Sequence, residues 1–245
     1  VFRKETLYQK MRALIIYLVI SAVFIGCTPI LSIDASTQSV YHFSDTDKNI
    51  SLLDISETFG TYDGSFVLYD NNLDSWKIYD LEEATKRIPP ESTYKIYDAL
   101  LGLESGIITP EHSSMTWNGD AFPFPSWEAD QDLNSAMQNS VNWYFQAIDS
   151  QLGINRVQEF LNKIEYGNQT TSSNLDLYWS DFSLKISPLE QVTLLKKFNT
   201  NEFHLNSQNV FSVKNAIKIA STPNGNFYGK TGTGRVNGQD INGWV

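Results

Sequence analysis

A serine and a lysine three residues apart give the sequence its first candidate chemistry. Ser92 and Lys95 lie in the segment ESTYKIYDALLGLESG, where apolar residues recur at helical spacing until Gly106. Residues i and i+3 share one face of a helix, so the Lys95 amine is expected beside the Ser92 hydroxyl. A serine becomes a strong nucleophile when a base takes its proton, and a lysine that burial keeps uncharged is such a base. In isolation, the same pattern describes a solvent-facing Ser/Lys pair.

A second motif, Lys230-Thr231-Gly232-Thr233, lies near the end of the sequence in a run typical of a strand. Its cation and hydroxyl groups suit a carboxylate, and Gly232 leaves room for a substrate along the strand edge. The backbone N–H groups of Ser92 and Thr233 are candidate donors of an oxyanion hole. A KTG triplet is common by chance, but its place on a strand far downstream of the Ser-x-x-Lys motif makes chance a weaker explanation.

Two polar triplets lie between these motifs. Ser140 and Asn142 belong to a Ser-Val-Asn triplet on a predicted helix, and they offer a hydroxyl for proton relay and an amide for holding a substrate amide. By themselves they describe the polar face of a helix. Tyr166 begins a Tyr-Gly-Asn triplet and the loop that ends before Trp179, which alone predicts a turn.

Taken together and in this order, the four motifs resemble those of penicillin-recognising serine enzymes. The joint pattern is similar to class D β-lactamases (oxacillinases) and to the extracellular sensor domain of BlaR/MecR-type β-lactam sensor-transducers. The resemblance runs from about residue 55 to the last residue and includes GSFVLYD, TWNG, PFPSW, DLNSAMQNSVNWYFQ and YGKTGTGRVNG.

This resemblance implies roles for individual residues. Ser92 is the expected nucleophile, Lys95 the general base after carboxylation by CO₂, and Ser140 the proton relay. No other cofactor is expected. The expected substrate-binding residues, among them Trp179 as support for the carbamate, are Asn142, Tyr166, Trp179, Lys230, Thr231, Gly232 and Thr233.

Asn142 separates two interpretations of the resemblance. Class D hydrolases typically carry an apolar valine at the matching position, whereas BlaR-like sensors carry asparagine. An amide there would hydrogen-bond Lys95 once CO₂ is lost and leave no base to activate water. The expected function is therefore a membrane-anchored β-lactam receptor, acylated on Ser92, that signals through a long-lived acyl-enzyme. The alternative is a secreted or lipoprotein class D β-lactamase with turnover; a transpeptidase fits less well because the domain is small.

The predicted elements run from strands through a block of helices and back to strands. GSFVLYD and SWKIYD flank an Asn/Asp-rich turn and predict a hairpin, and Asn237-Gly238 predicts a second one. A Ser-x-x-Glu capping box at Ser187, with proline at the first helical position, starts another helix. This order indicates an α+β domain of helices around an antiparallel sheet, of the β-lactamase/transpeptidase-like class D type by resemblance. The predicted helices cover residues 91–106, 132–153, 154–164 and 187–198.

The N-terminal part predicts a membrane anchor. Residues 13–33 form an uncharged apolar run of roughly the twenty residues that one membrane-spanning helix needs. Basic residues precede the run and Asp34 follows it, so the positive-inside rule places the domain outside the cell. A secretory signal starting at Met11 and a lipoprotein signal before Cys27 compete with this interpretation. The expected parts are a cytoplasmic flank (1–12), a transmembrane helix (13–33), a linker (34–54) and a C-terminally truncated sensor domain (55–245).

Composition limits the expected partners. The net charge of −10 comes without the clustered Lys and Arg that a nucleic-acid partner requires. Cys27 is the single cysteine and the three histidines lack metal-ligand spacing, so neither a disulfide framework nor a metal site is expected. In the family that the chain resembles, the cytoplasmic effector is a zinc protease. Because no HExxH motif occurs here, such an effector is expected upstream of Val1.

Overall fold

The computed structural model describes residues 49–172, 174–176 and 178–245. The chain divides into two compact units, residues 1–38 and 39–245, and every described residue belongs to the second. The predicted cytoplasmic flank (1–12), transmembrane helix (13–33) and most of the linker (34–54) lie outside the described residues. Within the described residues, no helix has the length and apolar character needed to cross a membrane.

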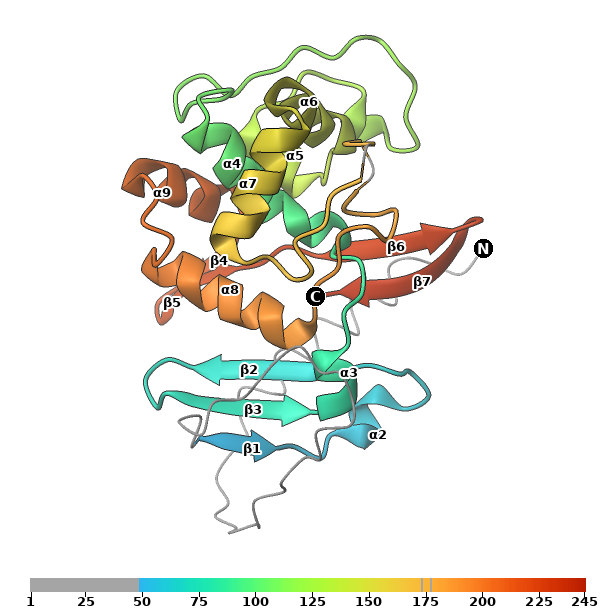
Figure 1. The fold of residues 1–245 in the computed structure, drawn as a ribbon, viewed down its shortest axis with the longest axis vertical. Coiled ribbons are helices and arrows are strands. Elements are labelled where there is room, and N and C mark those ends of the chain that lie inside the picture. Colours follow the sequence, from blue (N-terminus) through green and yellow to red (C-terminus); the bar gives the residue numbers. More distant parts are fainter. Residues whose placement is uncertain (1–48, 173, 177) are drawn as a thin grey trace. The chain divides into compact units, whose positions relative to one another are not determined.

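The described elements follow the predicted order of strands, helices and strands (Figure 1). They are β1 (Ile50–Leu52), α2 (Ser56–Phe59), β2 (Phe66–Asp70), β3 (Ser75–Tyr79), α3 (Leu81–Thr85), the 3₁₀ turn η1 (Glu91–Tyr94), α4 (Lys95–Glu104), the 3₁₀ turn η2 (Pro125–Trp127), α5 (Leu133–Gln138), α6 (Asn142–Leu152), α7 (Ile154–Ile164), α8 (Pro188–Thr200), α9 (Ser207–Ala216), β4 (Lys218–Thr222), β5 (Gly225–Tyr228), β6 (Gly232–Val236) and β7 (Gln239–Trp244).

The described strands form three separate sheets. β2 and β3 form the predicted antiparallel hairpin, and β1 adds to β3 in parallel. β4 pairs with β5 and β6 pairs with β7, both antiparallel. The β6–β7 turn has Asn237 and Gly238 at positive φ, as the Asn-Gly signal predicts. Each sheet therefore contains the antiparallel pairing expected for this fold. β1 adds to the first sheet in parallel, and it lies in the stretch that was assigned to the linker.

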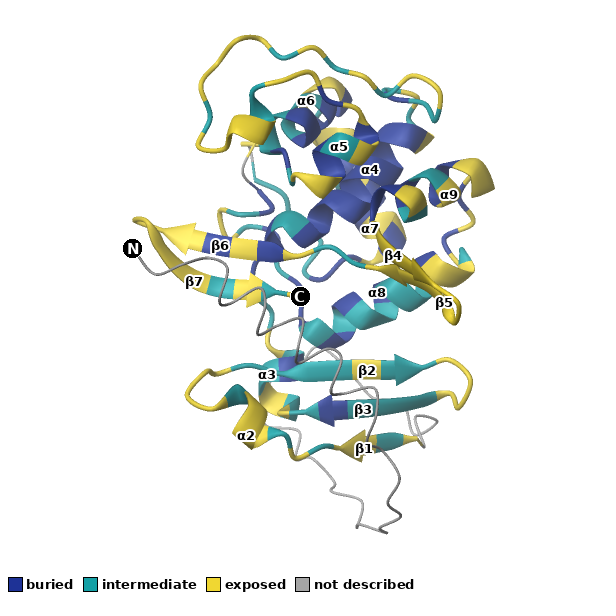
Figure 2. Cartoon of the chain, turned by 180° about the vertical axis from the view of Figure 1, so that it is seen from behind, coloured by how far each residue is buried: buried dark blue, intermediate teal, exposed yellow. Residues whose placement is uncertain are grey.

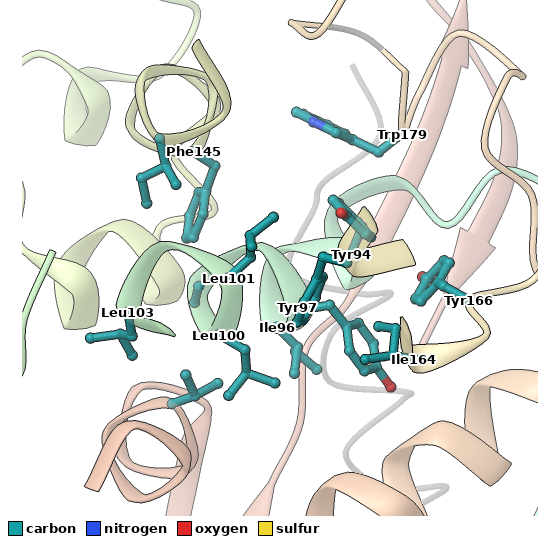
Figure 3. Packing of buried hydrophobic residues seen from close by; sticks show 14 of the residues in the cluster. Tyr94, Ile96, Tyr97, Leu100, Leu101, Leu103, Phe145, Ile164, Tyr166 and Trp179 are labelled. Atoms are coloured by element: carbon teal, nitrogen blue, oxygen red, sulfur yellow. The ribbon is translucent and has the colours of Figure 1, made fainter. Parts of the chain in front are cut away.

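Helix α4 is the centre of the core. Every residue from Lys95 to Leu103 is buried, which is typical of a helix that other elements surround (Figure 2). α6 and α9 pack against it. α6 approaches closely because a Cβ at Gly102 would lie only 2.9 Å from the Ile148 side chain. In Figure 3, Phe145 and Trp179 lie beside α4, whereas Tyr94, Tyr97 and Tyr166 gather near its start.

The helix predicted over residues 132–153 is two helices. α5 ends at Gln138 and α6 begins at Asn142, and between them Ser140 takes a φ of 56°, which an α-helix does not allow. The prediction of one continuous helix is therefore wrong. A continuous helix would point residues 140 and 142 to different sides, whereas the break frees each of them to face its own partner.

Candidate active site

The turn before α4 places Ser92 at the edge of the core. The Thr93 hydroxyl donates to the Pro90 carbonyl oxygen at 2.6 Å, and the Glu91 N–H donates to the Trp179 carbonyl oxygen at 3.1 Å. Thr93 is buried but Ser92 is only half-buried. The turn is therefore held from within the protein while the Ser92 side chain stays partly accessible.

Lys95 lies beside the Ser92 hydroxyl, as predicted. Its Nζ donates to Ser92 Oγ at 2.8 Å and to Asn142 Oδ1 at 2.7 Å. The centroids of the Trp179 and Phe145 rings lie 4.4 Å and 5.7 Å from the same nitrogen. Lys95 is 1% exposed, and none of the ion pairs in the described part of the chain involves it. The structure thus brings a serine and an amide together around a buried lysine.

The environment of Lys95 favours the neutral amine. Burial lowers the pKa of Lys95 well below its ordinary value, and the charge of Lys230 lowers it further, whereas Asp98 and Glu91 act in the opposite direction. A neutral amine has two N–H groups and one lone pair. It can therefore donate to Asn142 and at the same time accept the proton of Ser92.

Ser140 faces a second lysine. The Lys230 Nζ donates to Ser140 Oγ at 2.9 Å and to the Thr231 carbonyl oxygen at 2.8 Å. Burial lowers the pKa of Lys230 to about 8, so most of it is still an ammonium at neutral pH. This pair offers a hydroxyl that can pass a proton and a cation that can attract an anionic group.

Strand β6 runs along the Ser92 turn, and Gly232 lies at the closest approach. A Cβ at Gly232 would lie 3.3 Å from the Ser92 backbone nitrogen and 3.1 Å from the Pro90 carbonyl oxygen. Thr231 and Thr233 on either side are exposed. Glycine therefore keeps the space in front of the Ser92 N–H open, and the flanking threonines are available to a ligand.

Tyr166 lies in the core. Its ring is fully buried and packs edge-on against Tyr94 and Tyr97, with centroids 5.2 Å and 5.0 Å apart (Figure 3). Its hydroxyl donates to Gln191 Oε1 at 3.4 Å. A fully buried phenol does not reach a bound molecule, so this placement does not fit the expected substrate contact. Tyr166 instead supports η1 through Tyr94.

Glu91 is a site residue that the motifs do not indicate. It has a φ of 52°, is buried, and lies between the turn and β6, where a Cβ at Gly234 would overlap both Asn242 and Glu91. Burial raises the pKa of Glu91 to about 7, against the opposing effects of the Asn242 hydrogen bond and the Lys95 charge. In the sequence, Glu91 is marked only as an acidic residue directly before the nucleophile. Phe145 beside Lys95 is likewise not indicated, because its periodicity marks it as ordinary core.

Comparisons with known proteins show the family of the chain. The model of the penicillin binding protein transpeptidase domain matches residues 59–245. The chain belongs to this family. Among family members, it is 44% identical over 234 residues to the regulatory protein BlaR1 of Bacillus licheniformis, covering 95% of this chain and 38% of BlaR1.

Two solved structures of the family refine the comparison. The C-terminal domain of the Bacillus licheniformis BlaR penicillin-receptor superposes with a TM-score of 0.74 and 46% identity, over 78% of each chain. A class D β-lactamase from Bacillus subtilis superposes with a TM-score of 0.71 and 35% identity, over 74% of this chain and 76% of that one. The predicted resemblance to BlaR/MecR-type sensor domains on a class D fold is confirmed.

Proposed function

We propose that the chain is the β-lactam-binding part of a membrane-anchored receptor, which a β-lactam acylates on Ser92 to form a long-lived adduct that signals induction of resistance. The observation that carries this proposal is the 2.7 Å hydrogen bond from Lys95 to Asn142 beside the Ser92 hydroxyl. The similarity to the BlaR penicillin-receptor domain supports it.

Acylation follows from the placement of three side chains. As Ser92 Oγ attacks the lactam carbonyl carbon, its proton passes to Lys95 Nζ, 2.8 Å away. The ring C–N bond then breaks, and the leaving nitrogen takes the hydroxyl proton of Ser140, which the Lys230 ammonium 2.9 Å away replaces. Lys230, Thr231 and Thr233 bind the carboxylate of the β-lactam. The Ser92 and Thr233 N–H groups stabilise the oxyanion.

Persistence of the adduct follows from Asn142. After acylation Lys95 carries the Ser92 proton, and an ammonium that donates to Asn142 has no lone pair to activate water. Hydrolysis of the ester needs such a base. The acyl group therefore stays on Ser92 for as long as Lys95 stays protonated.

The pocket also fits a carbamate on Lys95, which remains an expectation from the family resemblance. The buried Nε1 of Trp179 has no hydrogen-bond partner among the described residues, and it is a suitable donor for a carbamate oxygen near Lys95. When present, the carbamate would supply an oxygen base for the Ser92 proton. No group of three or more His, Cys, Asp or Glu side chains in the described part of the chain is placed to hold a metal ion.

The second candidate function is hydrolysis by a class D β-lactamase. Its support is the 35% identity to the class D enzyme of Bacillus subtilis and the placement of Ser92 beside a buried lysine in this chain. The chain spans 38% of the length of BlaR1. The proposal therefore also includes a membrane helix at residues 13–33, an extracellular position of the domain and a cytoplasmic effector.

Labelling with a fluorescent penicillin tests the acylation of Ser92. We expect one label per chain, located by peptide mapping to the peptide that contains Ser92, and no label on the Ser92→Ala variant. Heat-denatured protein serves as the control for non-specific attachment. A label on another residue, or no label on the folded chain, would contradict the proposed function.

Gly232→Ala should slow acylation of Ser92 by about tenfold, or ~1.4 kcal/mol. The added methyl group would lie 3.3 Å from the Ser92 N–H and crowd the position of the oxyanion. Gly243→Ala on β7 is the matched control, because the nearest atom to its Cβ is 3.9 Å away. The rate of labelling measures the effect, and equal rates for the two variants would refute the role given to Gly232.

Non-covalent binding of penicillin should weaken as pH rises through about 8. Lys230 is charged below its pKa of about 8 and neutral above it, so the attraction for a carboxylate is present at low pH and lost at high pH. We expect roughly tenfold weaker binding to the Ser92→Ala variant in alkaline buffer. Lys230→Met should bind weakly at every pH. Binding to both variants is measured by calorimetry, and a pH-independent affinity of the Ser92→Ala variant would contradict this role.

A further inference from the structure

Two buried carboxyl groups lie behind Lys95 and take no part in the site described so far. Asp98 follows Lys95 by three residues on α4, and Asp149 follows Asn142 by seven on α6, so both lie on the faces that these helices present to one another. Both are 0% exposed. The Tyr178 hydroxyl donates to Asp149 Oδ1 at 3.1 Å, whereas both oxygens of Asp98 and Oδ2 of Asp149 have no donor among the described residues.

Such a pair cannot carry two negative charges. A buried carboxylate without donors is strongly destabilised, and the nearest cation is the single amine of Lys95. The cluster of Lys95, Asp98 and Asp149 is neutral in two arrangements. Either both carboxyls are protonated beside a neutral amine, or one is ionised beside an ammonium. The two arrangements contain the same number of protons, since one O–H bond breaks as one N–H bond forms.

We propose that Asp98 and Asp149 are positioning residues that hold protons between them and thereby keep Lys95 as the neutral amine that accepts the proton of Ser92. The link to acylation rests on the proposed function, whereas the effect on the charge of Lys95 does not. In this arrangement Asp149 makes ionisation of Asp98 less favourable. The proton that Lys95 must lose is therefore kept on the pair.

The surroundings of the pair agree with this assignment. Burial raises the pKa of Asp98 well above its ordinary value, and Asp149 raises it further through its charge and its hydrogen bond, against the opposing charge of Lys95. Burial also raises the pKa of Asp149 to about 8, although hydrogen bonds from Tyr178 and Asp98 lower it. The other neighbouring groups are Tyr94, Tyr144 and Tyr178, whose pKa values Asp98 raises, and Asp176 near Asp149.

The charged groups around Lys95 also affect its protonation state. Glu91 on η1 and Asp98 favour its ammonium, and Lys230 before β6 disfavours it. Of these groups, Asp98 is the one whose charge depends on Asp149. Removing the Asp149 carboxyl should therefore allow Asp98 to ionise and Lys95 to take up a proton. Removing both carboxyls should leave burial as the main influence on the pKa of Lys95, so Lys95 should return to the neutral amine.

The experiment compares D149N, D98N and the double variant D98N/D149N with the wild-type chain. The charge of Lys95 is read from the ¹³C shift of its ε-carbon during a pH titration in bicarbonate-free buffer, with Lys95→Ala to assign the signal. We expect the midpoint of Lys95 to rise by about one pH unit in D149N and to return close to the wild-type value in the double variant. D98N should change it little, because Asp149 then loses a hydrogen bond that favours its ionisation.

Acylation provides the second readout. A rise of one unit in the pKa of Lys95 reduces the amine fraction about tenfold, so D149N should be labelled about tenfold more slowly at neutral pH and recover in alkaline buffer. The double variant should react faster than D149N. Equal Lys95 midpoints in all four proteins, or losses that add in the double variant without a change of pH profile, would overturn the proposal.

The two readouts separate the inference from the proposed function. If penicillin does not label the wild-type chain, the proposed function fails, and the Lys95 titration still decides whether the pair controls the amine. If D149N does not fold, D149S, which removes the carboxyl with a smaller side chain, carries the same expectation. Thermal unfolding of each variant identifies loss of structure, and a fully folded D149S with an unshifted Lys95 midpoint would also overturn the proposal.

Discussion

The Asn142→Val variant should release hydrolysed penicillin on the order of 10²-fold faster than the wild-type chain, because it regains a base for deacylation. In the wild type, Asn142 Oδ1 accepts from Lys95 Nζ at 2.7 Å and stabilises the ammonium that acylation leaves behind. Valine offers no acceptor, and the burial of Lys95 then disfavours the charge. Lys95 should lose its proton and activate water. The decay of the adduct, followed by intact-protein mass spectrometry, measures this change.

Asn134→Val is the control for Asn142→Val. It makes the same change on the exposed surface of α5, away from Lys95, and should leave the lifetime of the adduct unaltered. Acylation of the Asn142→Val variant should stay fast, since Ser92 and Lys95 are intact. An unchanged lifetime in that variant would show that the amide does not disable the base.

Replacing Lys95 with alanine should slow acylation of Ser92 by roughly 10²- to 10⁴-fold, the range usual for the loss of a general base. Lys95 Nζ lies 2.8 Å from Ser92 Oγ, and no other amine of the described residues makes a hydrogen bond to that oxygen. The rate of labelling by fluorescent penicillin measures the effect. The loss is expected whether the chain is a receptor or a hydrolase, because both need the Ser92 proton removed.

Two further variants separate loss of the base from loss of structure. Lys95→Met retains most of the buried volume and should be as slow as Lys95→Ala. Lys163→Ala removes an exposed lysine on α7 and should react at the wild-type rate. Fast acylation of both Lys95 variants would exclude Lys95 as the base.

The parts of the site that depend on local geometry were predictable. Ser92 and Lys95 meet because they lie three positions apart at the start of a helix, and the Asn237-Gly238 signal places the β6–β7 hairpin. The capping box at Ser187 and the proline after it likewise begin α8 as predicted.

The parts that depend on tertiary packing were not predictable. Ser140 breaks the expected helix, and its unfavourable φ is accompanied by a contact with Lys230 from the distant segment before β6. Tyr166 is in the core because two other tyrosines cover it, which its turn-like triplet does not indicate. β1 is three residues long and gains its partner from the later strand β3, so no local pattern marks it.

The buried carboxyl pair illustrates the same limit. Asp98 and Asp149 each fall on the apolar face of a helix, where sequence alone gives an acid no partner. Packing of α4 on α6 places the two acids together, and only then does their effect on Lys95 become apparent. The nucleophile and base were therefore visible in the sequence, whereas the groups that set the charge of the base were not.

The lifetime of the adduct on Ser92 tests the central claim most directly. The purified chain is mixed with a stoichiometric amount of benzylpenicillin, and intact-protein mass spectrometry follows the adduct while the solution is assayed for penicilloate. The receptor proposed here predicts one persistent adduct per chain and almost no penicilloate. Rapid loss of the adduct with many equivalents of penicilloate per chain would contradict the claim and identify a hydrolase.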